Sequence, residues 1–305
     1  MPLYSVYDLT IHSEIPLPGM REGEGDPDIL VRYGSVECQP PEEIRINGYY
    51  GLGGDDIHYV WRGICRARIQ GGRRITVESE SGDHEDAIMN LVIGPFIALA
   101  MHQRGRLVMH GSGVLINGGV VGFVGNSGQG KSTTAAAFML EGYPIVTDDL
   151  LSVVELEDGS GFIAHIGGSQ IKLWPESVRA IGADPDHLPR IASVKDKRMY
   201  SFERSRTAQT LPLACIYVLE EGEEGIEPLK PNEALVELAR HSYCAILIDE
   251  MGDRRRHFMQ CARLAAHIPV RRLRRRLSLD HLDSIVRMVE QDQGGSQKSE
   301  VKSQN

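Results

Sequence analysis

The sequence predicts an α/β fold that follows a small β-rich domain. From Leu107 onward, short apolar runs alternate with helical patterns, which is typical of a layered α/β domain. A glycine-rich loop joins one of these runs to a helix. Before residue 82, short alternating runs dominate, as in a sheet with one buried face. These patterns divide the chain into a β-rich domain (1–82), an α/β domain (83–292) and a polar tail (293–305) that we expect to be disordered.

The first domain contains several runs with the period of a strand. Cys65–Ile69 alternates apolar and basic residues, Gly71-Gly72 turns the chain, and Ile75–Val77 continues the pattern. Ile29–Tyr33 and Ile57–Trp61 are further expected strands. We find no repeat and no cluster of catalytic residue types here, so the sequence leaves the role of this domain open.

A helix is expected at 83–103, where it links the two domains. Its apolar run, from Ala87 to Met101, is interrupted by Asn90 and by Gly94-Pro95. The run is too short and too interrupted to span a bilayer, so we expect a buried helix and no membrane association.

The most informative motif is the glycine-rich loop. Val120–Val124 is an apolar run, Gly125–Ser132 fits the phosphate-binding pattern G-x-x-x-x-G-K-[ST], and Lys131–Glu141 is helical in pattern. Strand, loop and helix in this order are the context that supports the motif. The candidate nucleotide-binding residues are Gly125, Asn126, Ser127, Gly128, Gln129, Gly130, Lys131, Ser132 and Thr133.

The chemistry of such a loop comes from its backbone. Glycines let phosphate oxygens approach the amide groups, and those amides lie at a helix N-terminus, where partial positive charge favours an anion. Lys131 would reach the β- and γ-phosphates and is expected to face solvent or ligand. The Ser132 hydroxyl would bind Mg²⁺, so ATP and Mg²⁺ are the predicted cofactors. The alternative is a glycine-rich turn with a solvated lysine.

Two further elements carry titratable groups. Asp148 and Asp149 follow the predicted strand Pro144–Thr147, where carboxylates can bind magnesium or act as a general base. Paired acids at a strand end can also merely cap a turn. His110 follows the run Leu107–Met109, and a lone histidine in that position is usually a structural group.

The remaining elements follow from period and turn signals. Further strands are predicted at Leu107–His110, Gly113–Ile116, Leu150–Glu155, Phe162–Ile166, Ala214–Leu219 and Val270–Arg274. Further helices are predicted at Glu176–Ile181, Asn232–Arg240, Asp253–His267 and Asp280–Gln291. The acidic stretch Glu220–Glu224 is interpreted as a solvated turn.

Charge is unevenly distributed. Residues 254–276 contain nine arginines and no acid, so with a net charge of −9 overall the rest of the chain carries −18. One interpretation is a surface for an anion or an acidic peptide. The other is a solvated helix face followed by an edge strand. Nucleic-acid binding is disfavoured because the chain as a whole is acidic.

The cysteines indicate a reducing compartment. Five of them are scattered without metal-type spacing, at positions 38, 65, 215, 244 and 261. We interpret them as reduced thiols, and with no signal-peptide pattern at Met1–Tyr4 we expect a cytoplasmic protein.

The order of these motifs resembles that of the HPr kinase/phosphorylase family, a group of serine kinases with a phosphate-binding loop. His110–Ile116, the loop at 125–132 and Glu141–Asp149 follow that family's order and spacing. The resemblance implies an HPr-kinase-like domain with a mixed sheet. It implies that Asp148 is the base that deprotonates a serine, that Asp149 helps to hold magnesium, and that His110 supports the reacting centre beside Lys131.

The chain also departs from that family. Thr133 stands where the family usually has a glutamate, and Gly167–Pro175 replaces its later glycine-rich signature. Within and after that stretch, three cations could contact phosphate or substrate, or could simply be solvated: Lys172, Lys197 and Arg198.

The nature of the acceptor follows only from the resemblance. Lys172–Pro175 and Pro269–Leu273 resemble the divergent branch that phosphorylates the C-terminal serine of lasso-peptide precursors, which implies a peptide or small-protein partner. HPr itself, a nucleotide-binding regulator without phosphotransfer, and a small-molecule enzyme such as a phosphoenolpyruvate carboxykinase remain alternatives. A homo-oligomer is also left open.

Overall fold

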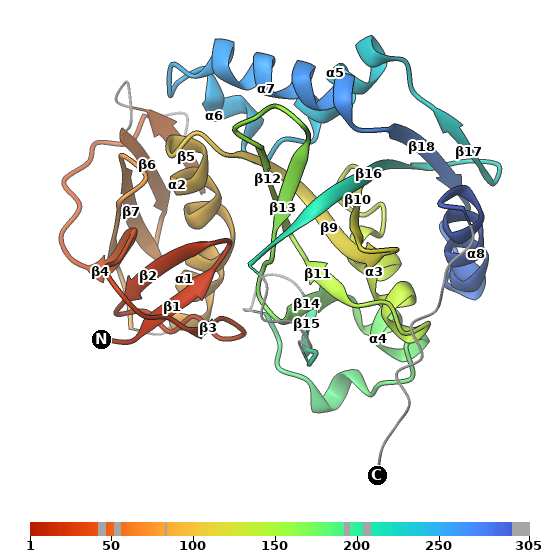
Figure 1. Cartoon of the computed structure of the whole chain (residues 1–305). Helices are drawn as coiled ribbons and strands as arrows, with labels where there is room; N and C mark the ends of the chain where they lie inside the picture. The colour runs from red at the N-terminus through yellow and green to blue at the C-terminus, as the bar shows by residue number, and fades with distance from the viewer. Residues whose placement is uncertain (42–46, 52–55, 83, 192–195, 204–208, 295–305) are drawn as a thin grey trace.

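The computed structural model has a mixed α/β fold (Figure 1). It describes residues 1–41, 47–51, 56–82, 84–191, 196–203 and 209–294. Two eight-stranded sheets and one two-stranded sheet account for the strands. The tail predicted to be disordered lies, from residue 295 onward, outside the described residues.

The N-terminal residues form the first sheet, whose strand order is β3-β1-β2-β4-β8-β7-β6-β5. Its strands are β1 (Leu3–Val6), β2 (Leu9–Ser13), β3 (Arg21–Glu22), β4 (Ile29–Tyr33), β5 (Asn47–Gly51), β6 (Asp56–Trp61), β7 (Cys65–Gln70) and β8 (Arg74–Ser79). The predicted strands at 29–33, 57–61, 65–69 and 75–77 correspond to β4, β6, β7 and β8. The hairpin β1–β2 was not predicted, because its turn is made by Tyr7 and Asp8 at positive φ rather than by glycine.

One long helix covers this sheet and also faces the second sheet (Figure 1). It comprises α1 (Glu85–Leu91), a π-helical turn (Val92–Phe96) and α2 (Ile97–Gln103). Pro95 lies in the π-helical turn, so the proline is accommodated without ending the helix. The helix is long and apolar enough to cross a membrane, but most of it is buried in the core of the protein. Its apolar composition is therefore explained by packing.

The second sheet is partly closed on itself. Its strands are β9 (Leu107–Ile116), β10 (Gly119–Val124), β11 (Ile145–Thr147), β12 (Leu150–Glu155), β13 (Phe162–His165), β16 (Thr210–Glu221), β17 (Gly225–Pro228) and β18 (Val270–Arg275). The order is β10-β9-β12-β13-β16-β18-β17, and β10 also pairs with β16. Five strands, β10, β9, β12, β13 and β16, therefore form a closed ring.

The parallel strand pairs in this sheet bring three carboxyl ends to one edge, where a ligand can bind. β10 pairs parallel with β16, and β16 pairs parallel with β18, so the three strands end at one edge. Ligands of open α/β sheets bind beyond the carboxyl ends of their parallel strands. The glycine-rich loop follows β10 at this edge.

Two predicted features of this sheet are wrong. The runs 107–110 and 113–116 belong to one strand, β9. Gly111 does not form a turn; instead it lets the neighbouring strand β10 come close, since a Cβ on Gly111 would lie 2.8 Å from the Phe123 carbonyl oxygen. The strand at 270–275 is not an edge strand, since β18 lies between β16 and β17.

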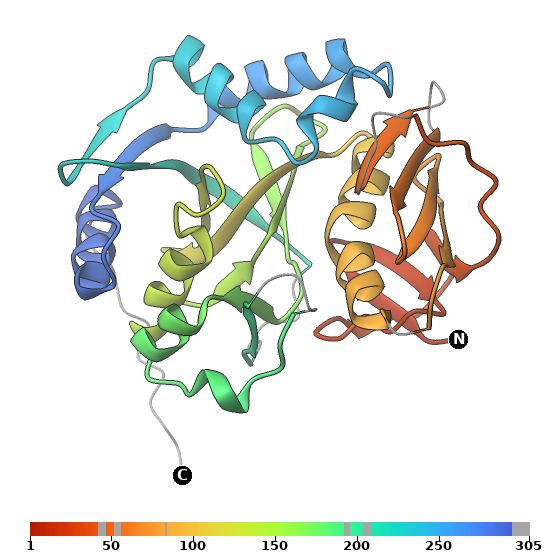
Figure 2. The same ribbon diagram turned by 180° about the vertical axis from the view of Figure 1, so that it is seen from behind.

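Helices cover both faces of the second sheet (Figure 2). The helices are α3 (Lys131–Leu140), α4 (Pro175–Ala180), α5 (Pro231–Arg240), α6 (Ala245–Ile248), α7 (Arg254–His267) and α8 (Leu282–Asp292), and the small sheet pairs β14 (Gln170–Leu173) with β15 (Arg198–Ser201). α3 and α8 pack on one face and α5 and α7 on the other. β14, β15, β17 and α6 were not predicted.

Strand β10 contributes to both cores because successive side chains point to opposite faces. Val121 and Phe123 pack with α3 and α8, whereas Val120 and Val124 face the α5–α7 side. The Phe123 ring is fully buried, with ring centroids 5.4 Å from Phe138. This packing fixes the strand that carries the glycine-rich loop.

The arginine-rich segment is largely neutralised within the chain. Arg272 and Arg274 of β18 pair with Glu220 and Glu227 of the neighbouring strands. Arg271 pairs with Asp292. The acidic stretch predicted to be a solvated turn thus includes a partner of the arginines, because β16 and β18 are adjacent.

Candidate active site

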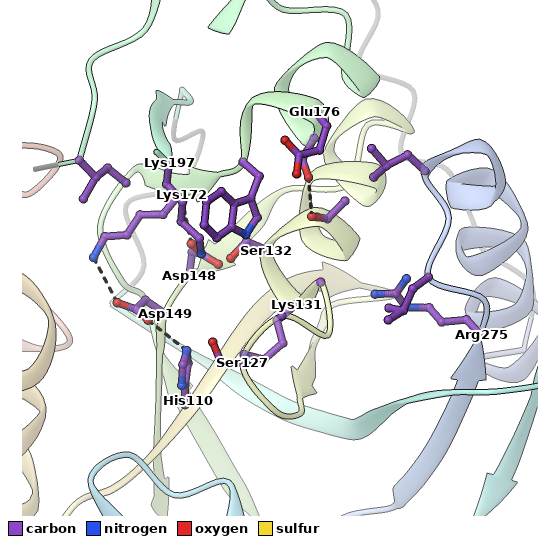
Figure 3. A pocket seen from close by; sticks show the side chains of 18 of the residues that line it. His110, Ser127, Lys131, Ser132, Asp148, Asp149, Lys172, Glu176, Lys197 and Arg275 are labelled. Carbon is purple, nitrogen blue, oxygen red and sulfur yellow. Dashed lines mark hydrogen bonds and ion pairs between the residues drawn. The ribbon is translucent and has the colours of Figure 1, made fainter. Parts of the chain in front are cut away.

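A cavity of about 550 Å³ opens at the carboxyl ends of β10, β16 and β18 (Figure 3). Its walls come from the glycine-rich loop, the β11–β12 turn, the β14–α4 segment and the residues that follow β18. The side chains most relevant to chemistry are His110, Lys131, Ser132, Asp148, Asp149, Lys172, Lys197, Tyr243 and Arg275. The structure therefore brings together most of the predicted site residues from segments far apart in sequence.

The glycine-rich loop joins Val124 of β10 to Lys131 of α3. Gly128 and Gly130 adopt φ of +88° and +68°, which glycine tolerates without strain. The Gln129 side chain folds back and accepts a hydrogen bond from the Asn126 amide at 2.9 Å. The loop thus holds a turn that leads directly into the helix N-terminus.

Lys131, which was expected to face solvent or ligand, is shielded from solvent but lines the cavity. The residue is only 8% exposed, and its ammonium donates to the carbonyl oxygens of Gly125 and Asn126 at 2.9 and 3.0 Å. Burial lowers the pKa of Lys131. Lys131 still lines the cavity, so an anion in the cavity could replace these carbonyl oxygens as the partner of the ammonium.

Asp148 is held by hydrogen bonds from three directions. The Ser112 hydroxyl of β9 donates to Oδ1 at 2.6 Å, and the Lys172 amide donates to Oδ2 at 3.1 Å. The Ser132 hydroxyl is a further hydrogen-bond partner. Burial raises the pKa of Asp148, and the neighbouring Asp149 adds to this shift. A fixed carboxylate with a raised pKa has the properties of a general base.

Asp149 has a different environment. Its backbone adopts φ of +71°, which turns the side chain toward His110 and Lys172. The carboxylate lies 3.4 Å from His110 Nε2 and 3.2 Å from Lys172 Nζ. Burial alone would raise the pKa of Asp149, but these two groups outweigh it and lower that pKa to about 2. Asp149 is therefore a permanent anion.

His110 lies between the acidic pair and an aromatic side chain. Its ring centroid is 5.3 Å from that of Tyr243, which precedes α6. Burial lowers the pKa of His110 to about 4; Asp149 opposes this shift, and three nearby lysines add to it. The imidazole is thus neutral at pH 7 and can accept or donate a hydrogen bond.

The three cations proposed as phosphate or substrate contacts are not equivalent. Lys172 and Lys197 line the cavity, and Lys197 Nζ lies 5.6 Å from the Trp174 ring centroid. Arg198 is not brought to the cavity. It is buried and bonded to the Pro185 carbonyl oxygen and to Asp196, so it ties β15 to the adjacent segment.

Several cavity residues were not identified from the sequence. Ser112 lies within the glycine-containing stretch after His110, yet nothing in that pattern marks its hydroxyl. Tyr243 and Pro95 come from segments without a motif. Arg275 belongs to the arginine-rich segment, and the sequence does not distinguish it from the eight other arginines there. Long-range pairing brings Pro95, Tyr243 and Arg275 to the cavity, and it brings Ser112 to Asp148, through which Ser112 acts on the site.

The donor set of the cavity can support Mg²⁺ only together with a ligand. Within the described residues, no group of three or more His, Cys, Asp or Glu side chains could hold a metal by itself. Ser132 and the Asp148–Asp149 pair supply oxygen donors, and Mg²⁺ usually combines one or two carboxylates with phosphate oxygens. The residues therefore fit a magnesium ion that arrives with a nucleotide.

Comparison with known proteins gives a distant neighbour. No family model matches the chain, and no curated protein matches it either. Among solved structures, the Hpr(Ser) kinase/phosphatase from Coxiella burnetii aligns with 62% of this chain and 99% of its own, at 11% sequence identity and a TM-score of 0.34.

The close packing behind the loop can be tested at Gly130. A Cβ there would lie 2.4 Å from Arg275 Nη2, whereas Gly142, also at positive φ, has no atom within 4 Å of the same position. Gly142→Ala should cost about 1–2 kcal/mol for its backbone alone, and Gly130→Ala about 1–3 kcal/mol more from the overlap. Urea unfolding at pH 7 measures both. Equal losses would contradict the contact.

Proposed function

We propose that this chain is an ATP-dependent kinase that transfers the γ-phosphate to a hydroxyl group, with serine as the acceptor. One observation carries the proposal: a glycine-rich loop with its lysine and serine faces a pair of aspartates and a histidine across one cavity. The loop suits phosphate, and the acidic pair suits deprotonation of an attacking hydroxyl.

The proposed reaction is an in-line displacement. The acceptor hydroxyl oxygen attacks the γ-phosphorus, the bond from that phosphorus to the β,γ-bridging oxygen breaks, and ADP leaves. The hydroxyl proton passes to Asp148. Magnesium, held by Ser132 and Asp149 together with the nucleotide, would neutralise charge on the phosphates. Lys131 would leave its carbonyl partners to bind the β- and γ-phosphates.

The assignment of base and metal ligand rests on electrostatics. A carboxylate with a raised pKa, Asp148, accepts a proton more readily than one with a pKa of about 2, Asp149. The hydrogen bond between Asp148 and Ser132 also brings the former near the metal position. Exchange of the two roles is therefore the specific alternative to this mechanism.

His110 and Lys172 complete the proposed reacting centre. Neutral His110 would orient Asp149 and the acceptor through hydrogen bonds. Lys172 contacts both acids, through its backbone amide and its ammonium, and so balances their charge. His110→Ala should be milder than loss of the base, because orientation can be partly replaced.

The acceptor that we propose is a serine of a peptide or small protein, most specifically the C-terminal serine of a lasso-type precursor. The support is the resemblance of residues 110–149 to HPr kinases, combined with an N-terminal domain that differs from theirs. HPr and binding of ATP without transfer are the competing functions. Pro95 and Tyr243 would flank the acceptor, since they line the cavity beside Asp149.

Nucleotide binding should depend on the Lys131 ammonium. Lys131→Ala removes a charged hydrogen-bond donor, and we expect affinity for Mg·ATP to fall about 10- to 100-fold. Calorimetric titration measures this, with circular dichroism to show that the fold is kept. Lys230→Ala, which removes an exposed lysine far along the chain, serves as the control. Unchanged affinity in a folded Lys131→Ala variant would refute the loop assignment.

Phosphotransfer should depend on Asp148. Asp148→Asn is expected to bind Mg·ATP normally and to transfer phosphate about 10²- to 10⁴-fold more slowly. In the wild type, protonation of the base should reduce the rate as pH falls, with a midpoint above the ordinary aspartate value of about 4. If instead Asp149→Asn abolished transfer and Asp148→Asn kept it, the two roles would have to be exchanged.

The acceptor class can be settled by direct transfer. The protein is incubated with γ-labelled ATP and either HPr or a precursor peptide that ends in serine, with the same peptide ending in alanine as the matched control. We expect label on the serine-ending peptide alone. Label on HPr only would overturn the lasso-type proposal and retain the kinase. Label on neither, with ATP bound, would favour the regulatory alternative.

A further inference from the structure

Arg275 is placed at the glycine-rich loop by the sheet topology. It is the last residue of β18, and β18 runs parallel to β16, which runs parallel to β10. The carboxyl ends of β18 and β10 therefore lie at the same edge of the sheet, on either side of β16, and the loop begins at this edge. In Figure 3, the Arg275 side chain reaches the loop from the side opposite to Asp148 and Asp149.

The Arg275 guanidinium is packed directly against the loop backbone. The residue is only 4% exposed, and its Nη2 donates to the Gln129 carbonyl oxygen at 2.6 Å. It fills the space that a Cβ on Gly130 would need. Arg275 also lines the cavity together with Gly128 and Lys131. Its position is thus fixed before any ligand binds.

This cation lacks an anionic partner within the part of the chain that the structure describes. Arg271, Arg272 and Arg274 of the same strand each have carboxylate partners, whereas Arg275 has no ion pair with a described residue. Its buried Nε has no hydrogen-bond partner there either. A buried charge without a counter-ion is costly, and an anion bound in the cavity would offset that cost.

We propose that Arg275 is a second phosphate-binding cation of the nucleotide site, in addition to Lys131. This inference rests on the proposed function, because it assumes that the loop binds a nucleotide. A guanidinium presents several donors in one plane, which suits two oxygens of a phosphate group.

The side of the loop on which Arg275 lies identifies the phosphates that it contacts. The transferred phosphate has to approach the Asp148–Asp149 pair, and Arg275 lies across the loop from that pair. It therefore contacts the β-phosphate, which remains on ADP and is absent from AMP. Such contacts are equal in the ground state and the transition state, so they affect affinity rather than the chemical step.

The test compares two adjacent arginines of β18. Arg275→Met removes the buried cation and keeps an unbranched apolar side chain, and Arg274→Met removes a half-buried, paired cation. Binding of Mg·ADP and Mg·ATP is measured by calorimetry on wild type and both variants. We expect Arg275→Met to weaken binding of both nucleotides about 10- to 100-fold. Arg274→Met should bind both nucleotides like the wild type.

The affinities for ADP and AMP, the latter measured by competition with ADP, distinguish loss of a phosphate contact from a general distortion of the loop. Arg275→Met should affect ADP much more than AMP, and an equal loss for both would overturn the inference. If Arg275→Met does not fold, Arg275→Lys replaces it. Arg275→Lys keeps the positive charge but loses the planar set of guanidinium donors, so it should lose part of the ADP affinity. Wild-type ADP affinity in this variant would also overturn the inference.

The result also distinguishes this inference from the proposed function. If Lys131→Ala loses nucleotide affinity while Arg275→Met binds Mg·ADP like the wild type, only the inference on Arg275 fails. If the wild type binds neither nucleotide, the proposed kinase function fails.

Discussion

The site depends on one constraint, the parallel pairing of β10 with β16 and of β16 with β18. This pairing brings the ends of three strands to one edge, although β10 and β18 are about half the chain apart in sequence. The glycine-rich loop leaves the first of these strands and Arg275 ends the last. The antiparallel strand β9 adds Ser112 and His110 to the same region. A change of register in any of these pairs would separate groups that must lie within a few ångströms.

A second constraint is electrostatic. The carboxylates of buried Asp148 and half-buried Asp149 repel each other, and their surroundings differ. Asp148 receives neutral hydroxyl and amide donors, whereas Asp149 receives the ammonium of Lys172 and faces His110. Burial raises the pKa of Asp148 despite its hydrogen-bond donors, and Asp149 adds to that shift, whereas Lys172 and His110 lower the pKa of Asp149. Separated pKa values in one pair of acids are the usual basis for assigning them different chemical roles.

The sequence predicted the local features well and the long-range ones poorly. The loop at 125–132 and the helices near 131–141, 254–267 and 282–292 depend on short patterns, and these patterns lie within a few residues of the observed elements. The single strand β9 was missed because its glycines permit close approach between strands, which resembles a turn in the sequence. Arg275 could not be distinguished from Arg274, since only the fold decides which of the two faces the cavity.

The closed ring of five strands has a consequence for motion. In a ring, every strand has a neighbour on both sides, so no strand at the floor of the cavity can separate without breaking two ladders of hydrogen bonds. Amide hydrogens of β10 should therefore exchange with solvent only when the whole domain unfolds. The walls made by β14, β15 and the segment after β18 lie outside this ring. Any widening of the cavity has to come from those walls, while its floor stays rigid.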